Sequence, residues 1–259
     1  MPAASTGASE ADHTLAAQLA TDAGKLLVEL RDRVAGRGLP SRAIGREGDA
    51  ASHAFLMERL GELRPDDAVL SEEGPVSIRA DDARLRSDRV WIVDPLDGTR
   101  EFGDIPRTDW AVHVALVIQG RVAAGAVALP ARETTLASFP PPVLPPPRAG
   151  APRVVVSRSR PPFEARRIAR ELGAELVQLG SAGAKAMAVV LGDADVYPHS
   201  GGQFEWDSAA PVAVAQAAGL HTSRLDGAPL VYNQRDPYLP DLLICRPELA
   251  ATVIAAATS

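Results

Sequence analysis

One stretch organises this chain: Trp91-Ile92-Val93-Asp94-Pro95-Leu96-Asp97-Gly98-Thr99-Arg100-Glu101-Phe102. It begins as an apolar run of strand type and then places two carboxylates, Asp94 and Asp97, before a glycine and a hydroxyl. A strand buried in a sheet would hold these carboxylates as hard oxygen ligands for a cation. Gly98 and Thr99 could offer backbone N–H groups to an anion, since glycine lets a ligand approach the chain closely. The alternative interpretation is a polar turn, because Asp-Pro and Asp-Gly are common turn dipeptides.

Length and composition indicate an ordinary globular protein. A chain of 259 residues fits one large domain or two packed lobes, and 46% apolar with 23% charged residues is typical of soluble proteins. The net charge of -6 argues against a nucleic-acid duplex as partner, because such binding depends on Lys and Arg that neutralise phosphates. It does not exclude a small phosphate ester, since cations or local Arg residues can reverse the field at a site.

The single cysteine limits the redox and metal chemistry of the chain. Cys245 lies in an apolar run, so we expect a buried thiol, and neither an intrachain disulfide nor a thiolate metal cluster can form. The N-terminus lacks the pattern of a secretory leader, and no apolar run reaches membrane-spanning length. We therefore expect a cytoplasmic protein with no membrane partner.

The order of predicted elements changes at a proline-rich segment, residues 139–147, which reads as a stiff connection between lobes. We predict an N-terminal α+β lobe over 1–139 that carries most metal ligands, and a C-terminal α/β lobe over 140–259 with the substrate-recognition residues. Before the segment, periodicity predicts helices at 14–33 and 49–63, strands at 68–71 and 90–93, and a hairpin of 111–118 with 121–129. After it, strands (153–157, 174–179, 194–197, 242–245) alternate with helices (162–172, 182–191, 206–218, 247–256).

Several acids stand where strands end or helices begin: Glu72, Asp94, Asp97, Asp207 and Asp49. Each has a structural alternative when it is taken alone. Asp49 and Asp207 fit helix N-caps, and Glu72 fits a solvated turn. For His113, within a predicted strand, we favour a packed core residue over a ligand. Together the acids are typical of a Mg²⁺ site, because Mg²⁺ is bound through carboxylates, water and substrate phosphate oxygens.

Two segments resemble the signatures of the inositol monophosphatase superfamily. The members of this superfamily are Mg²⁺-dependent, lithium-sensitive phosphomonoesterases. They are Trp-Ile-Val-Asp-Pro-Leu-Asp-Gly-Thr at 91–99 and Trp-Asp-Ser-Ala-Ala at 206–210. Glu72 and Asp49 resemble the family's further acidic residues in order and approximate spacing. The resemblance covers residues 14–246 and implies a layered αβαβα fold with an N-terminal antiparallel-sheet lobe and a C-terminal α/β lobe. Family members are often homodimers, so the resemblance also implies a homodimer.

Within the superfamily, the chain is most similar to the CysQ branch of 3'(2'),5'-bisphosphate nucleotidases. Residues 100–102 (Arg-Glu-Phe), 156–160 (Val-Ser-Arg-Ser-Arg) and 192–198 (Gly-Asp-Ala-Asp-Val-Tyr-Pro) carry this similarity. It implies hydrolysis of 3'-phosphoadenosine 5'-phosphate to AMP and phosphate, in sulfur assimilation or nucleotide clearance. Inositol 1-monophosphate or fructose 1,6-bisphosphate remains the alternative substrate. Two features depart from the branch: His199 replaces an Arg after Tyr-Pro, and a glycine-rich hairpin is replaced by 137–147.

The resemblance also implies roles for individual residues. One Mg²⁺ would be held by Glu72, Asp94 and the Leu96 carbonyl, and a second by Asp94, Asp97 and Asp207. A third, weaker ion could lie near Glu72. Thr99, with Glu72 or Asp49, would orient or deprotonate the attacking water, and the Gly98 and Thr99 N–H groups would bind phosphoryl oxygens. The substrate contacts implied are Leu96, Asp97, Gly98, Thr99, Ser157, Ser181, Lys185, His199 and Asp207.

Overall fold

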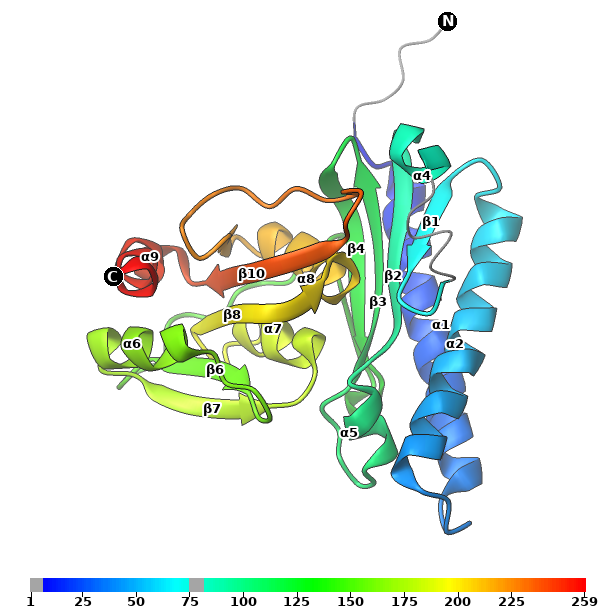
Figure 1. The fold of residues 1–259 in the computed structure, drawn as a ribbon, viewed down its shortest axis with the longest axis horizontal. Helices are drawn as coiled ribbons and strands as arrows, with labels where there is room; N and C mark the ends of the chain where they lie inside the picture. Colours follow the sequence, from blue (N-terminus) through cyan, green and yellow to red (C-terminus); the bar gives the residue numbers. More distant parts are fainter. Residues whose placement is uncertain (1–6, 75–81) are drawn as a thin grey trace, which may run out of the picture.

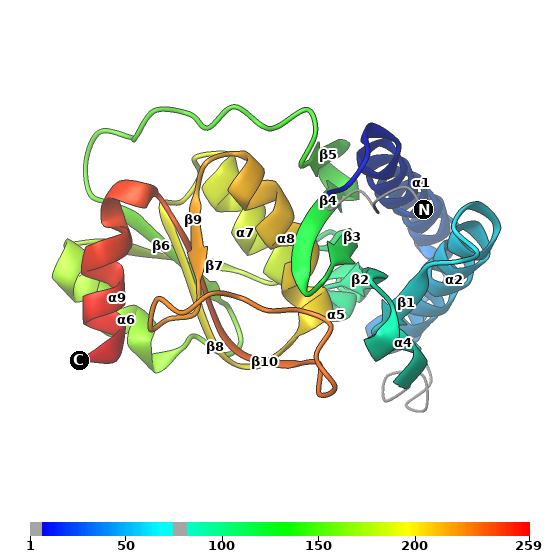
Figure 2. The ribbon, with the colours of Figure 1, turned by 90° about the horizontal axis from the view of Figure 1, so that it is seen from above.

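A computed structural model describes residues 7–74 and 82–259 and shows alternating layers of helices and sheets (Figure 1). Helices α1 (Glu10–Val34) and α2 (Ser41–Leu63) cover the outer face of the first sheet. Helices α7 (Ala182–Val190) and α8 (Glu205–Ala217) lie between the two sheets (Figures 1 and 2). Helices α6 (Phe163–Leu172) and α9 (Ala250–Thr258) cover the far face of the second sheet. The predicted layered αβαβα architecture is confirmed.

Each sheet has five strands. The first has the order β1 (Ala68–Ser71), β2 (Arg89–Asp97), β3 (Ala111–Ile118), β4 (Arg121–Leu129) and β5 (Thr134–Ala137). The second has the order β7 (Glu175–Leu179), β6 (Arg153–Ser157), β8 (Val196–Phe204), β10 (Tyr238–Cys245) and β9 (His221–Ser223). The first sheet is mixed rather than wholly antiparallel, because β1 pairs in parallel with β2. In the second, β6 is parallel to β7 and β8, and β10 is antiparallel to β8 and β9.

Strand β2 is buried on both faces, as its continuous apolar run predicts. Val90 and Ile92 belong to the central core, which fills the space between the two sheets with α7 and α8. Trp91 and Val93, one position along, pack in the core beneath α1 and α2. A third core lies between the second sheet and helices α6 and α9. Because both faces of β2 are buried, its end, which carries Asp94 and Asp97, lies in the middle of the molecule.

The predicted hairpin of β3 and β4 is confirmed. Ile118 pairs with Arg121, and the two residues between them, Gln119 and Gly120, both have positive φ angles of 50° and 77°. A two-residue loop of this kind matches the right-handed twist of the flanking strands. The hairpin sets β3 in the centre of the first sheet, beside β2.

Helix α2 is longer than predicted, and the N-cap interpretation of Asp49 is wrong. The helix begins at Ser41 and not at Asp49, which lies inside it. Two glycines inside the helix, Gly45 and Gly48, allow close packing. A Cβ atom at Gly45 would lie 2.7 Å from Thr99 Cγ2, and one at Gly48 would lie 2.7 Å from Phe102 Cε1. The glycines therefore bring α2 against α5 (Thr99–Gly103), a short helix that begins within the stretch 91–102.

Other element bounds differ in detail. Strands β8 and β10 extend beyond the predicted 194–197 and 242–245, because they pair with each other over most of their length. Helix α8 begins at Glu205, and the final predicted helix divides into a 3₁₀ turn (Pro247–Leu249) and α9. The short elements α4 (Asp82–Arg86), α5, β5, β9 and the 3₁₀ turn Pro130–Arg132 were not predicted.

The proline-rich segment runs without regular secondary structure from β5 to β6 (Figure 2). Arg246 Nη2 donates to the carbonyl oxygen of Pro145 at 3.0 Å, and this bond ties the segment to the second sheet. The predicted division at residue 139 falls at its start and stays a prediction, since helices α7 and α8 also pack against the first sheet. Cys245 is buried, as expected. Within residues 7–74 and 82–259, no helix has the length and apolarity to span a membrane.

Candidate active site

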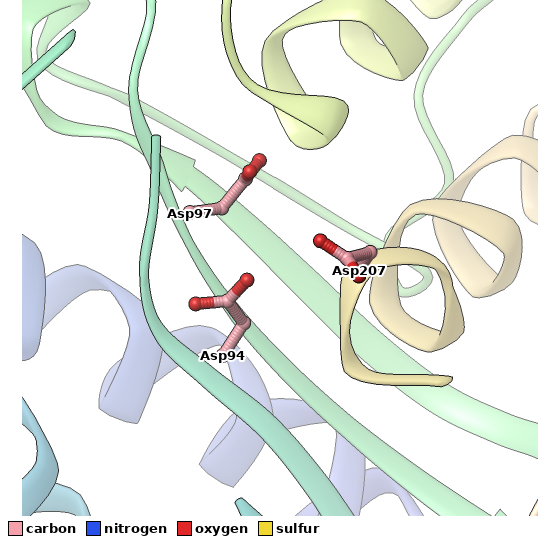
Figure 3. Close-up of side chains that lie close together, drawn as sticks. All are labelled: Asp94, Asp97 and Asp207. Carbon is pink, nitrogen blue, oxygen red and sulfur yellow. The ribbon is translucent and has the colours of Figure 1, made fainter. Parts of the chain in front are cut away.

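Three carboxylates meet in the interior of the molecule (Figure 3). Asp94 and Asp97 come from the end of β2 and Asp207 from the first turn of α8, and each offers an oxygen within 4.8 Å of the others. Asp94 and Asp97 are 1% and 6% exposed, so their charges are largely removed from water. The structure thus brings together three of the predicted metal ligands from segments more than a hundred residues apart.

A shift in strand register lets both β2 carboxylates serve one site. Asp94 pairs with His113 and Asp97 with Ala111, so β2 carries one more residue than β3 between these pairs. Side chains three positions apart on a regular strand point to opposite faces, whereas an extra residue re-aims the next side chain. Pro95 and Leu96 occupy the irregular step. Gly98 then turns the chain with a φ of 85°, where a Cβ would lie 2.9 Å from Ser181 Cβ.

Asp97 is held by the start of helix α7. Its Oδ1 accepts from the Ala182 N–H at 3.0 Å, and its Oδ2 accepts from the Gly183 N–H at 2.6 Å. His113 Nε2 lies 3.2 Å from the same Oδ2. Burial raises the pKa of Asp97, but the charge and contact of His113, Lys185 and the Gly183 N–H outweigh it and hold the pKa at about 2. Asp97 is therefore ionised at neutral pH.

His113 is fully buried, as predicted for a core residue, but it also contacts the site. Its Nδ1 donates to the Trp206 carbonyl oxygen at 3.0 Å. Burial lowers the pKa of the ring, whereas Asp97 raises it, and the second effect prevails. The sequence gives no local sign of these contacts, because both partners come from other elements.

The other acids of the site have higher pKa values than free carboxyl groups, so they take up a proton at higher pH. Burial raises the pKa of Asp207 to about 7, with the charge of Asp97 as the next cause. Burial likewise raises the pKa of Glu72 to about 7, and burial with the charge of Glu72 raises that of Asp94 well above its ordinary value. Glu72 follows β1 and interacts with Asp94, but it lies outside the group of three. The N-cap interpretation of Asp207 is wrong, because Phe204 is the N-cap of α8 and Asp207 lies in its first turn, where Oδ2 accepts from the Phe204 N–H at 2.7 Å.

Thr99 and Asp49 form a second polar pair beside these acids. The Thr99 hydroxyl lies 3.2 Å from Asp49 Oδ1 and 3.2 Å from the Leu96 carbonyl oxygen, with which it can form alternative hydrogen bonds. Burial raises the pKa of Asp49 to about 7, and the charge of Glu73 adds to this. A hydroxyl that donates to such a carboxylate can pass on a proton near neutral pH.

A pocket of about 210 Å³ opens beside the carboxylates. It is lined by all the predicted substrate contacts except Leu96, namely Asp97, Gly98, Thr99, Ser157, Ser181, Lys185, His199 and Asp207. Arg100, Arg160 and Gln203 line it too, although the sequence did not predict them as substrate contacts. A larger cavity of about 510 Å³ lies between α1 and the β4–β5 connection, away from these acids. Chemistry rather than size therefore locates the site.

Two predicted substrate contacts already have partners within the protein. Lys185 Nζ donates to the carbonyl oxygens of Gly180 and Ser181 at 2.6 and 2.7 Å, and burial lowers its pKa to about 8. His199 Nε2 donates to the Gly201 carbonyl oxygen at 3.0 Å, and burial followed by the charge of Lys185 lowers its pKa to about 4. His199 is thus uncharged at neutral pH.

The donor set fits a hard divalent cation. Asp94, Asp97 and Asp207 offer only oxygen, and burial with repulsion between the acids raises the pKa of Asp94 and Asp207, so that nearby positive charge would stabilise their ionised forms. A Mg²⁺ ion prefers oxygen ligands and would supply that charge. The same atoms would not favour a soft metal, which binds thiolate or thioether sulfur.

Comparison with known proteins gives consistent results. The model of the inositol monophosphatase family matches residues 11–140 and 148–259. The chain is 51% identical over 255 residues to the 3'-phosphoadenosine 5'-phosphate phosphatase of Mycobacterium leprae, covering 94% of this chain and 92% of that protein. It is 33% identical over 236 residues to the 3'(2'),5'-bisphosphate nucleotidase CysQ of Escherichia coli K12, covering 86% and 94%.

Solved structures agree in fold. CysQ from Bacteroides thetaiotaomicron, described as a bacterial member of the inositol monophosphatase family, superimposes with a TM-score of 0.77 at 25% identity and covers 92% of this chain and 97% of its own. Inositol monophosphatase II from Staphylococcus aureus gives a TM-score of 0.78 at 22% identity, with 95% of each chain covered. The second likeness concerns the fold alone.

Proposed function

This chain belongs to the inositol monophosphatase family, and from that premise we propose that it hydrolyses the 3'-phosphate of 3'-phosphoadenosine 5'-phosphate to AMP and phosphate. The observation that carries the proposal is 51% identity, over 94% of the chain, to a protein named for this activity. The carboxylate cluster beside a polar pocket supports metal-dependent phosphatase chemistry.

The site would hold two Mg²⁺ ions, one between Asp94, Asp97 and Asp207 and the other between Asp94, Glu72 and the Leu96 carbonyl. When bound, the ions would offset the charge of the phosphoryl group and lower the pKa of water. We propose that both ion sites are filled in the active enzyme, that Asp94 contacts both ions, and that a weaker third ion binds near Glu72. The oxygen donors of the three aspartates support it.

The chain's own groups would orient water and receive its proton. Thr99 Oγ would accept the proton of the attacking water as it donates its own to Asp49 Oδ1, which lies 3.2 Å away. A pKa of about 7 suits Asp49 as the proton acceptor near neutral pH. The Gly98 and Thr99 N–H groups would bind the phosphoryl oxygens, where negative charge redistributes during the reaction. No covalent phosphoenzyme is required.

The nucleotide beyond the reacting phosphate would lie along the pocket in the second half of the chain. Arg100, Arg160 and Lys185 supply positive charge there, and Ser157 and Ser181 supply hydroxyls. Since His199 is uncharged at neutral pH, it would contact the substrate only as a hydrogen-bonding group. These assignments predict a preference for an ester with a second phosphate.

Turnover on three substrates with Mg²⁺ tests the proposal: 3'-phosphoadenosine 5'-phosphate, inositol 1-monophosphate and fructose 1,6-bisphosphate. We expect the nucleotide to have the highest kcat/KM. A preference of about tenfold or more for inositol phosphate, equivalent to about 1.4 kcal/mol, would contradict the substrate assignment. Asp97→Asn should lower turnover by at least about two orders of magnitude in a folded protein, and retained activity would contradict the metal assignment.

Two further parts of the proposal concern the protein in solution. We propose that it forms a homodimer, which sedimentation can test, and that it works in the cytoplasm, which fractionation of the source cells can test. A monomer at micromolar concentration would contradict the homodimer. A protein found only outside the cytoplasm would contradict the cytoplasmic location.

A further inference from the structure

His113 links two parts of the carboxylate cluster that come from different layers. It stands within β3 and is fully buried. Its Nδ1 donates to the carbonyl oxygen of Trp206, the residue before Asp207, at 3.0 Å. Its Nε2 lies 3.2 Å from Asp97 Oδ2. One imidazole ring therefore contacts a carboxylate at the end of β2 and the backbone at the start of α8.

The surrounding backbone is built closely around this ring. His113 pairs with Asp94 in the sheet, so the two side chains share the inner face. A Cβ atom at Gly183 would lie only 2.1 Å from His113 Nε2, so helix α7 can approach the ring only with glycine at this position. The ring thus fills the point where β2, α7 and α8 meet, and the Gly183 N–H contacts the same Asp97 oxygen.

A residue that only filled this space would need no polar atoms. Burying a polar ring costs free energy unless its nitrogens face suitable partners. In His113, Nδ1 donates a hydrogen bond to the Trp206 carbonyl oxygen, and Nε2 makes a 3.2 Å charge contact with Asp97 Oδ2 that lacks hydrogen-bond geometry. Groups behind a metal ligand commonly set its orientation and are worth about 10–100-fold in metal affinity.

We propose that His113 is a positioning residue of the metal centre, which fixes the Asp97 carboxylate relative to Asp207. The inference rests on the proposed function, since it assumes that these carboxylates hold a cation. The Ala182 N–H holds Asp97 Oδ1, and the Gly183 N–H and His113 Nε2 both contact Oδ2, so rotation of the carboxylate is limited at both oxygens. The remaining lone pairs of Asp97 are thereby kept toward Asp94 and Asp207, which lie within 4.8 Å.

The experiment measures binding of Mn²⁺ alone to the full-length, metal-stripped protein, by electron paramagnetic resonance of the free ion and by calorimetry. Three variants separate the roles of the ring: His113→Leu keeps much of the volume, His113→Asn keeps a donor near the Nδ1 position, and His113→Gln keeps one near Nε2. We expect Leu and Asn to weaken Mn²⁺ binding by about 10–100-fold and Gln to stay within about threefold of the original protein. Val117→Ala, in the same buried strand, is the control for general destabilisation and should keep the original affinity.

The outcomes distinguish the inference from the function on which it rests. If His113→Leu binds Mn²⁺ as tightly as the original protein, the ring is only packing and the inference is overturned. If that variant does not fold, equal affinities of the Asn and Gln variants overturn it instead. If Asp97→Asn also leaves Mn²⁺ binding unchanged, the proposed metal site itself fails, and the inference fails with it. Weak binding by Leu and Asn, with recovery by Gln, supports the positioning role.

Discussion

Asp94 offers a test in which stability and activity should move in opposite directions. It is 1% exposed and lies beside Glu72, Asp97 and Asp207. Burial, followed by the charges of Glu72 and Asp97, raises its pKa well above the ordinary value of 3.8. In the unfolded chain this carboxyl group ionises freely, so at neutral pH the metal-free native state bears a cost whether Asp94 keeps its charge or takes up a proton. Asp94→Asn should therefore stabilise the metal-free protein.

The structure sets the scale of this effect. Two unit charges at the 4.8 Å limit of the cluster repel by about 3.5 kcal/mol in a medium of effective dielectric constant 20. Asn can keep the hydrogen bond from the Leu96 N–H, now 3.1 Å from Oδ1, and can turn its amide toward Glu72. After allowance for relaxation, we expect an increase in the free energy of unfolding of about 1–3 kcal/mol, or a Tm higher by roughly 2–10 °C. Mg²⁺ at 100 times its Kd should stabilise the original protein by about 2.7 kcal/mol, but not the variant.

The assay is urea unfolding at neutral pH with EDTA or with Mg²⁺, together with phosphatase turnover. Asp94→Asn should be more stable in EDTA, gain no stability from Mg²⁺ and be inactive. Asp67→Asn is the matched control, since Asp67 accepts from Arg89 Nε at 2.9 Å and from Trp91 Nε1 at 2.8 Å. Neutralising this partnered carboxylate should lower stability in both media. A metal-free Asp94→Asn protein that is less stable than the original would refute the reasoning.

Three other predictions concern separate residues and ions. Thr99→Val should lower kcat by about 10²–10⁴-fold, and Thr99→Ser should stay within about tenfold; an active Val variant would exclude the hydroxyl from proton transfer. Lithium at millimolar concentration should inhibit in competition with Mg²⁺, and insensitivity would count against the two-ion site. Burial raises the pKa of Asp12, but hydrogen bonds from Ser9 and Arg89 outweigh it and lower the pKa to about 2. The resulting stabilisation is present above the unfolded pKa of 3.8 and is lost as pH falls toward 2. Asp12→Asn should thus cost about 1–3 kcal/mol in urea unfolding at neutral pH, and this gap should close near pH 2; a constant gap would contradict the assignment.

Local sequence patterns predicted much of the fold because burial has a strong local signature. The apolar run before Asp94, the hairpin around Gln119 and Gly120, and the alternation of strands and helices after residue 150 are confirmed. The acids at the end of β2 could also be identified from the sequence, because they directly follow an apolar run of strand type and match a family signature. The roles of these acids as metal ligands stay predictions.

Features that depend on distant partners could not be predicted. Asp49 fitted an N-cap because the predicted helix began there, whereas the helix begins at Ser41 and the missing side chains of Gly45 and Gly48 make room for Thr99 and Phe102. The register shift after Asp94 depends on pairing with β3. His113 contacts a carbonyl group 93 residues away, so no pattern around it indicates that contact.

The hydrogen bonds from helix α7 to Asp97 affect the order in which parts of the protein can fold during synthesis. The Ala182 N–H that binds this carboxylate lies 85 residues further along the chain. At about 5–20 residues per second, synthesis reaches Ala182 on the order of 4 to 17 seconds after Asp97. Until then β2 and β3 can pair, but the carboxylate has neither backbone donor from α7. The first sheet can therefore form on the ribosome well before the reaction centre, which is completed only by the later half of the nascent chain.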